Sequence, residues 1–148
     1  MQVLDRVSIV LKQKAQQVWS IAPSATVYDA LALMAEKEIG SLLVMDGAKL
    51  RGLVSERDYA RKIILKGRSS KDTRVEEIMI SPPVAVSPDT SIDDAMRIMT
   101  ENRVRHLPVV STDGATMGIV SIGDLVKWII TSHEETIEQL QSYISGSA

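Results

Sequence analysis

Cysteine and phenylalanine are both absent from this chain of 148 residues, which has only two Trp and three Tyr. The lack of cysteine excludes disulfides, thiolate nucleophiles and cysteine-based zinc or iron–sulfur sites, and it suits a cytoplasmic protein. The two histidines, His106 and His133, are too few for a three-histidine catalytic metal site. So few aromatic side chains cannot form a platform for stacking nucleic-acid bases. We therefore expect no metal centre and no nucleic-acid partner.

The sequence also lacks a strong excess of charge and any long apolar run. Its 17 basic and 19 acidic residues give a formal net charge of −2, which argues against binding nucleic acid through net charge. No apolar run approaches the roughly 20 residues that a membrane span needs, so we expect no membrane partner. With 45% hydrophobic and 24% charged residues, the chain has the composition of a globular protein.

An internal repeat is the most informative feature of the sequence. The segment PSATVYDALALMAEKEIGSLLVMD (23–46) aligns with PDTSIDDAMRIMTENRVRHLPVVS (88–111), 65 positions later. The match resumes where GLVSERDY (52–59) aligns with GIVSIGDL (118–125), now 66 positions apart, so one residue has been inserted in the turn between them. Such duplication predicts two copies of one structural unit that pack on each other with pseudo-two-fold symmetry.

Each copy has the pattern of a β-α-β-β-α unit, which makes the predicted fold class α+β. Thr26 with Asp29, and Ser91 with Asp94, have the spacing of capping boxes at the start of the first helix. Apolar residues then recur at helical spacing, and two strands surround a glycine-containing turn. The predicted strands are 18–21, 42–45, 50–55, 84–86, 107–110 and 116–121, and the predicted second helices are 57–66 and 124–131.

The expected organisation places a helix at each end of the repeated units. Residues 1–17 read as an amphipathic helix with Leu4, Val7 and Leu11 on one side. The two units are 18–67 and 83–131, joined by a linker, 68–82, in which 75–79 forms a short helical turn. Residues 132–148 read as a separate C-terminal helix that aligns Ile137, Leu140 and Ile144.

Two strand-to-helix junctions carry the candidate chemistry. Ser55 and Asp58 stand at the first junction, and Ser121 and Asp124 stand at the same place in the second copy. A helix N-terminus offers unpaired N–H groups to a phosphate, and a nearby carboxylate can accept hydrogen bonds from both ribose hydroxyls. The alternative is that Ser-x-x-Asp is a helix cap and nothing more.

The duplicated unit, together with NRVRHLPVV (102–110) and GIVSIGD (118–124), resembles the cystathionine-β-synthase (CBS) domain family. The run from SERDYARKIILKGRSSK to VEEIM and SIGDLVKW is similar to small stand-alone CBS-pair proteins of bacteria and plant organelles. The resemblance covers about Val18 to Ile130. It implies a tandem CBS pair, or Bateman module, that binds adenine nucleotides in the clefts between its copies and forms homodimers.

The resemblance also implies which residues contact the ligand. The family's ribose-binding carboxylates fall on Asp58 and Asp124, and its ligand-contacting hydroxyls fall on Ser55 and Ser121.

Only the second copy supplies the family's basic positions before the second strand. These positions fall on Arg105 and His106, whereas Gly40 and Ser41 stand there in the first copy. We therefore expect two unequal sites, and His106 is either structural or tunes phosphate affinity through its protonation. The aliphatic environment expected around adenine comes from Ile21, Val86 and Pro108.

The predicted function is a non-enzymatic regulatory module that binds AMP, ATP or NAD(H) and signals to a protein effector. It requires no cofactor, and the sequence has no phosphate-binding loop or catalytic motif of the common kinds. One alternative is a constitutive interaction scaffold whose clefts are empty, and a weaker one is a small nucleotide hydrolase. The seven basic residues within 57–74 read as a solvated helix face and linker, or else as a contact for a polyphosphate or an acidic partner.

Overall fold

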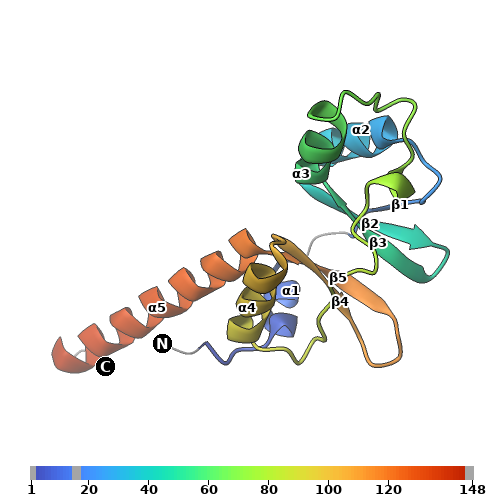
Figure 1. The fold of residues 1–148 in the computed structure, drawn as a ribbon. Helices are drawn as coiled ribbons and strands as arrows, with labels where there is room; N and C mark the ends of the chain where they lie inside the picture. The colour runs from blue at the N-terminus through green and yellow to red at the C-terminus, as the bar shows by residue number, and fades with distance from the viewer. Residues whose placement is uncertain (1–2, 15–17, 146–148) are drawn as a thin grey trace.

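Two α+β units, one per copy of the repeat, make up the computed structural model of this chain, which describes residues 3–14 and 18–145 (Figure 1). The helix α1 (Val7–Lys14) comes first, and the short 3₁₀ turn η2 (Val75–Glu77) lies in the linker. The first unit contains β1 (Ser20–Ile21), α2 (Val27–Lys37), β2 (Ser41–Asp46), β3 (Lys49–Ser55), α3 (Glu56–Tyr59) and the π-helical turn η1 (Ala60–Ile64). The second contains α4 (Ile92–Asn102), β4 (His106–Val110), β5 (Thr116–Ser121) and α5 (Ile122–Ser145).

The two sheets differ in the strand that opens each unit. In the first sheet β2 is central, parallel to β1 and antiparallel to β3. In the second sheet β4 and β5 form an antiparallel pair, and the predicted strand 84–86 is reduced to one parallel bridge between Val86 and Val109. Pro108 of β4 has no N–H to donate to this segment, whereas Leu43 at the equivalent position of β2 donates to Trp19 O at 3.3 Å, which accounts for the shorter pairing.

The first helix of each unit begins and ends in the same way. Asp29 N–H donates to Thr26 Oγ1 at 3.1 Å, and Asp94 N–H donates to Ser91 Oγ at 3.1 Å. Both helices end at a left-handed residue, Glu38 in the first and Arg103 in the second. The repeat therefore preserves the local backbone as well as the apolar pattern.

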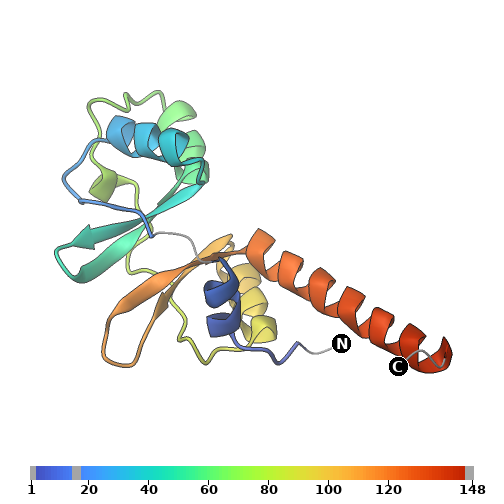
Figure 2. The same ribbon diagram turned by 180° about the vertical axis from the view of Figure 1, so that it is seen from behind.

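Each unit has its own core, and each core is completed by a segment from outside the unit's main body. Val7 and Val10 of α1 are buried in the core of the second unit. Val75 and Ile78, in and after η2, are buried in the core of the first unit. The α1 helix therefore crosses from its place before the first unit to cover the second (Figures 1 and 2).

The two covering segments dock through equivalent backbone hydrogen bonds. Val7 N–H donates to Thr90 O at 2.9 Å, and Val75 N–H donates to Ala25 O at 2.8 Å. The sequence signal for this equivalence is the pair DRVSIVL (5–11) and TRVEEIM (73–79), which extends the repeat beyond the predicted boundaries.

The predicted helix over 1–17 is wrong in its extent. The helix begins at Val7, and Leu4 lies before it with 71% of its surface exposed, so Leu4 does not share the apolar side of Val7 and Leu11. Residues 3–6 are extended because their backbone pairs with the start of α4, as Arg6 does with Ser91. Residues 1–2 and 15–17 of that prediction lie outside the described residues.

The predicted break between a helix ending at about Thr131 and a separate helix over 132–148 is also wrong. One helix, α5, runs without interruption from Ile122 to Ser145. Residues 124–145 contain no Gly or Pro that would end a helix. Its C-terminal part projects away from both units in the two opposite views (Figures 1 and 2). Among the described residues, no helix is both long enough and apolar enough to cross a membrane.

Gly52 and Gly118 test how closely the segment after η2 and the helix α1 approach the two sheets. A Cβ at Gly52 would lie 2.6 Å from the backbone oxygen of Ile80, whereas one at Gly118 would first meet the mobile Leu11 Cδ2 at 3.1 Å. We expect Gly52→Ala to lower the free energy of unfolding by about 1–3 kcal/mol and Gly118→Ala to cost less. Urea denaturation followed by circular dichroism measures both, and equal losses would contradict the proposed approach.

Candidate functional site

Two cavities between the units contain the predicted hydroxyl–carboxylate pairs. The first, here called the Asp124 cleft, has a volume of about 240 Å³ and is lined by Ser121 and Asp124. The second, the Asp58 cleft, has a volume of about 550 Å³ and is lined by Ser55 and Asp58. Each cleft takes residues from both units, as expected for two sites related by the repeat.

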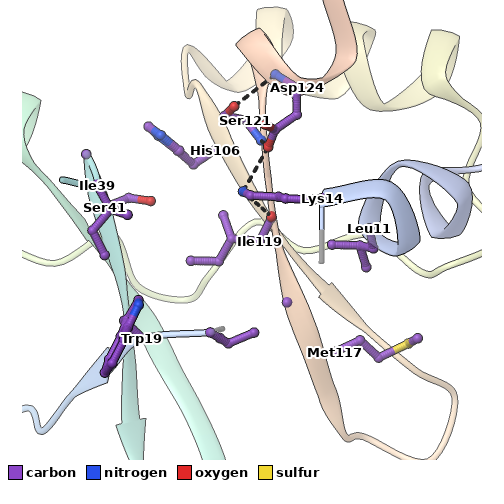
Figure 3. Close-up of a pocket in the computed structure, with 13 residues that line it drawn as sticks. Leu11, Lys14, Trp19, Ile39, Ser41, His106, Met117, Ile119, Ser121 and Asp124 are labelled. Carbon is purple, nitrogen blue, oxygen red and sulfur yellow. Dashed lines mark hydrogen bonds and ion pairs between the residues drawn. The ribbon is translucent and has the colours of Figure 1, made fainter. Parts of the chain in front are cut away.

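The Asp124 cleft has apolar walls and one lysine. Trp19 and Ile39 line it from the first unit, Met117 and Ile119 line it from β5, and Lys14 enters from α1 (Figure 3). Lys14 Nζ donates to Asp124 Oδ2 at 2.9 Å and to Ile119 O at 3.1 Å. A flat apolar group can lie against such walls, with its polar end directed to the carboxylate.

The Asp58 cleft is strongly basic. Arg57 contacts the second unit across this cleft, because its Nη1 donates to Arg103 O at 3.2 Å. Lys62 Nζ lies 3.5 Å from Asp58 Oδ1 and donates to Ile78 O at 2.8 Å. The cationic side chains that line this cleft are Arg57, Arg61, Lys62, Arg103 and Arg105.

Reciprocal hydrogen bonds fix both hydroxyl–carboxylate pairs. Ser121 N–H donates to Asp124 Oδ2 at 2.9 Å, and Asp124 N–H donates to Ser121 Oγ at 3.0 Å. Ser55 N–H donates to Asp58 Oδ2 at 3.0 Å, and Asp58 N–H donates to Ser55 Oγ at 3.3 Å. These pairs are full capping boxes at the starts of α5 and α3, so the capping role that the sequence suggested is present.

Capping does not keep these carboxylates away from the clefts. The caps Thr26 and Ser91 show only the bond from the Asp N–H to the hydroxyl, and neither residue lines a cleft. Asp124 Oδ2 accepts from Lys14 Nζ and from the Ser121 N–H, and Oδ1 has no donor among the described residues. The reciprocal bonds hold the carboxylate at the cleft wall while one of its oxygens stays open.

His106 lies where the two clefts meet and lines both of them. Its ring stands over Gly40 of the first unit, with ring atoms 3.9 Å from the position of a Cβ there. Burial lowers the pKa of His106 below its ordinary value, and the positive charges of Lys14 and Arg105 lower it further against the opposing effect of Asp124 and Asp58. The imidazole is therefore neutral at pH 7 and joins the two clefts through one side chain.

Asp124 is ionised at neutral pH. Burial acts to raise its pKa, but the hydrogen bonds from Lys14 and from the Ser121 N–H outweigh burial and lower the pKa below the ordinary value. An ionised carboxylate accepts hydrogen bonds and is a poor general acid. Asp124 can therefore hold hydroxyl groups rather than protonate a leaving group.

The structure places three of the sequence-predicted residues away from both clefts. Ile21 packs against the core of the first unit, Val86 belongs to the core of the second unit, and Pro108 is buried in β4. The side chains of Ile21 and Val86 pack in the cores. Pro108 alternates with the core residues Leu107 and Val109, so it lies on the opposite face of β4. Trp19 and Ile39 instead supply apolar lining from the first unit, contrary to the expectation of a purely aliphatic environment.

Arg105 and His106 both line the Asp58 cleft, across from Ser55 and Asp58. Of the two clefts, Arg105 lines only the Asp58 cleft and Ser41 only the Asp124 cleft, whereas Gly40 and His106 line both. Lys14 was missed because it precedes the repeat as the sequence defined it. The sequence signal for Lys14 was DRVSIVL (5–11), which matches TRVEEIM (73–79) in the linker. This match places the helix that carries Lys14 beside the second unit.

A metal centre is not indicated. Within residues 3–14 and 18–145, no group of three or more histidine or acidic side chains is placed to hold a metal ion.

Comparison with known proteins identifies the family. The CBS domain model matches residues 15–65 and 75–131. The chain belongs to the CBS-domain family. It is 40% identical over 150 residues to the mitochondrial CBS domain-containing protein CBSX3 of Arabidopsis thaliana, covering 95% of this chain and 72% of that protein. The match confirms the predicted tandem CBS pair.

Two solved structures share this fold at high identity. A CBS-domain protein from Burkholderia ambifaria, described as a candidate signal-transduction protein, is 49% identical with a TM-score of 0.81, over 86% of this chain and 95% of that one. CBSX2, a protein of Arabidopsis thaliana, was crystallised in complex with AMP. It is 33% identical with a TM-score of 0.65, over 80% of this chain and 92% of that one. This chain is thus a CBS pair of the regulatory type, with a relative that binds an adenine nucleotide.

The lowered pKa of His106 predicts a pH dependence of stability. The unfolded state takes up a proton at about pH 6.5, before the folded state does, so the free energy of unfolding falls as the pH drops through this value. His106→Gln should remove this part of the dependence, whereas His133→Gln, at an exposed position of α5, should leave it. Urea unfolding at several pH values measures the slopes, and the same slope for His106→Gln and wild type would contradict the assignment.

Proposed function

We propose that this CBS pair is a non-catalytic sensor that binds adenine nucleotides, such as AMP, ATP or NAD(H), in the Asp124 and Asp58 clefts. The observation that carries this proposal is the repeated Ser–Asp pair, which places an ionisable carboxylate and a helix N-terminus on the wall of each cleft. The carboxylate accepts the ribose hydroxyls, as Asp and Glu do in other nucleotide sites. The AMP complex of CBSX2 supports this choice of ligand.

The charges around the clefts suggest how phosphate groups are held. In the Asp58 cleft, arginines from α3 and from the turn before β4 converge from the two units. Arginine binds phosphate oxygens in a bidentate manner, so this cleft suits a ligand with several phosphates. The Asp124 cleft has only Lys14 as a cation of full charge, and it suits a ligand with less phosphate.

A ligand in either cleft contacts both units and can change how they pack. The signal is the difference in affinity between two arrangements of the units, because a ligand shifts an equilibrium only by that difference. We infer that the output goes to a protein effector. The cytoplasmic setting expected from the lack of cysteine belongs to this proposal as well.

A scaffold that works through α5 remains the second candidate. The C-terminal part of α5 carries Leu140 and Ile144, with 57% and 83% of their surfaces exposed, on a helix that extends beyond both units (Figure 1). Apolar side chains in such a position suit contact with another protein. A scaffold needs no ligand, so nucleotide binding separates the two candidates.

A thermal-shift panel of AMP, ADP, ATP and NAD(H) tests nucleotide binding. A ligand at about 100 times its dissociation constant should stabilise the protein by roughly 2.7 kcal/mol. Asp124→Asn and Asp58→Asn should each reduce the shift, because each weakens the grip on a ribose. Asp29→Asn is the matched control, since Asp29 follows a cap hydroxyl at the same spacing but lines neither cleft.

The absence of a shift with every nucleotide would reject the sensor and favour the scaffold. A shift that Asp29→Asn reduces as much as Asp124→Asn does would show that the carboxylates act only through helix capping.

We further propose that the protein pairs with a second copy through its second helices. Ile64 and Ile130 occupy equivalent positions in the two copies and are 57% and 53% exposed, and Leu65 and Val126 beside them are 79% and 40% exposed. The repeat thus presents the same apolar feature twice, as a symmetric dimer interface requires.

Ile130→Glu should weaken this pairing, because a charge would be buried in an apolar interface. Sedimentation velocity measures the association, and we expect a shift from dimer to monomer at micromolar concentration. Leu4→Glu is the control, since Leu4 is more exposed than Ile130, at 71% against 53%, and lies outside α3, η1 and α5. An unchanged dimer in Ile130→Glu, or a monomeric wild type, would reject this interface.

A further inference from the structure

Lys14 is the one charged residue of the Asp124 cleft that comes from outside both repeated β-α-β-β-α units. Its helix is firmly placed, since Val7 and Val10 are buried in the second core and Trp128 Nε1 donates to Asp5 Oδ2 at 3.0 Å. From this fixed base the side chain reaches across to Asp124 (Figure 3). Its ammonium is held by two oxygens at once, Asp124 Oδ2 and Ile119 O.

The Asp58 cleft reaches a similar arrangement by a different route. There the lysine is Lys62, four residues after Asp58 on the same helix, and it also donates to a backbone carbonyl. In the second copy the equivalent position is Trp128, which has no charge. Lys14 therefore supplies from α1 the ammonium that the second copy lacks, and at 2.9 Å it lies closer to its carboxylate than Lys62 does at 3.5 Å.

This ion pair competes with a ribose for the same carboxylate. Asp124 Oδ2 already accepts from the Ser121 N–H and from Lys14, which fills the two lone-pair sites of that oxygen. A ribose diol that uses both carboxylate oxygens must therefore displace Lys14. The ion pair is three-quarters buried on both sides, so solvent screens it only in part.

A second cavity next to the ion pair can accommodate the displaced ammonium. A second hollow of about 200 Å³ lies between α1 and α5, and Lys14 and Asp124 line it as well as the Asp124 cleft. The ion pair thus stands between two cavities. Lys127 also lines this hollow, so it offers the ammonium no new anion. A ligand phosphate would supply an anionic partner, whereas an uncharged nucleoside would supply none.

We propose that Lys14 is the specificity-determining residue of the Asp124 cleft: it blocks the ribose carboxylate until an anionic group on the ligand draws it away. The cleft therefore selects nucleotides over their nucleosides. This inference rests on the proposed function, since it concerns the same ribose site. It differs from that proposal because it assigns the choice of ligand to a helix outside the repeated units.

Titration of ¹⁵N-labelled protein with adenosine and with AMP tests this role. The backbone amides of Ser121 and Asp124 report the Asp124 cleft, and those of Ser55 and Asp58 report the other, so each site is read separately in the intact chain. In Lys14→Gln we expect adenosine to bind the Asp124 cleft about fivefold more tightly than in wild type. That factor corresponds to about 1 kcal/mol, the upper value for a partly exposed ion pair.

AMP should gain less from Lys14→Gln than adenosine does, because the variant removes its phosphate partner as well as the block. The preference for AMP over adenosine should therefore shrink in the Asp124 cleft and stay unchanged in the Asp58 cleft. Lys12→Gln is the matched control, since Lys12 is an exposed lysine of the same helix and lines neither cleft. It should leave all affinities at their wild-type values.

Two outcomes overturn the inference while the proposed function stands. One is an adenosine affinity that does not rise in Lys14→Gln. An unchanged affinity would mean that Lys14 has no effect on binding, and a weaker affinity would mean that Lys14 contacts the ligand directly. The other is an equal gain in affinity for AMP and adenosine, which would show that Lys14 does not distinguish a charged ligand from an uncharged one. If neither pair of amides moves with AMP or adenosine in any variant, this inference fails, and the thermal-shift panel with ATP and NAD(H) decides whether the proposed function fails with it.

Discussion

The reciprocal hydrogen bonds between serine and aspartate at each strand-to-helix junction are the interaction on which the site depends. In each copy the pair both begins a helix and fixes a carboxylate on the wall of a cleft. A cap needs only the bond to the hydroxyl, as Thr26 and Ser91 show. The second bond, from the serine N–H to the carboxylate, orients the aspartate, so helix capping and the presentation of a carboxylate to the cleft use the same geometry rather than compete for it.

Duplication builds two such sites, but the surroundings make them unequal. The Asp58 cleft gathers arginines from both units, whereas the Asp124 cleft is apolar, with Trp19 on one side and Lys14 on the other. The inequality comes from residues that differ between the copies. The His106 ring lies over Gly40, and Trp128 of the second copy stands where the first copy has Lys62. His106 lines both clefts, so the two cavities share one side chain.

The parts of the fold that the sequence could predict are those set by local pattern. Helix starts, the four long strands and the two glycine turns follow from spacing and from positive backbone angles at Gly47 and Gly114. The residues Ile21, Val86 and Pro108 show where such reasoning stops, because alternation marks a buried face without saying whether it borders a core or a cavity. The false break near Thr131 has a similar cause, since a change in the repeat does not by itself end a helix.

The lining of the Asp124 cleft was harder to predict, because it depends on where α1 packs in the fold. The α1 helix precedes the first unit in sequence but completes the core of the second, so Lys14 and Asp124 meet across more than a hundred residues. This crossing ties the two units together at both ends, since η2 completes the first core from the linker. In the function proposed above, a ligand in the Asp124 cleft contacts α1, β5 and the first unit together, so its binding would bear on how the two units pack.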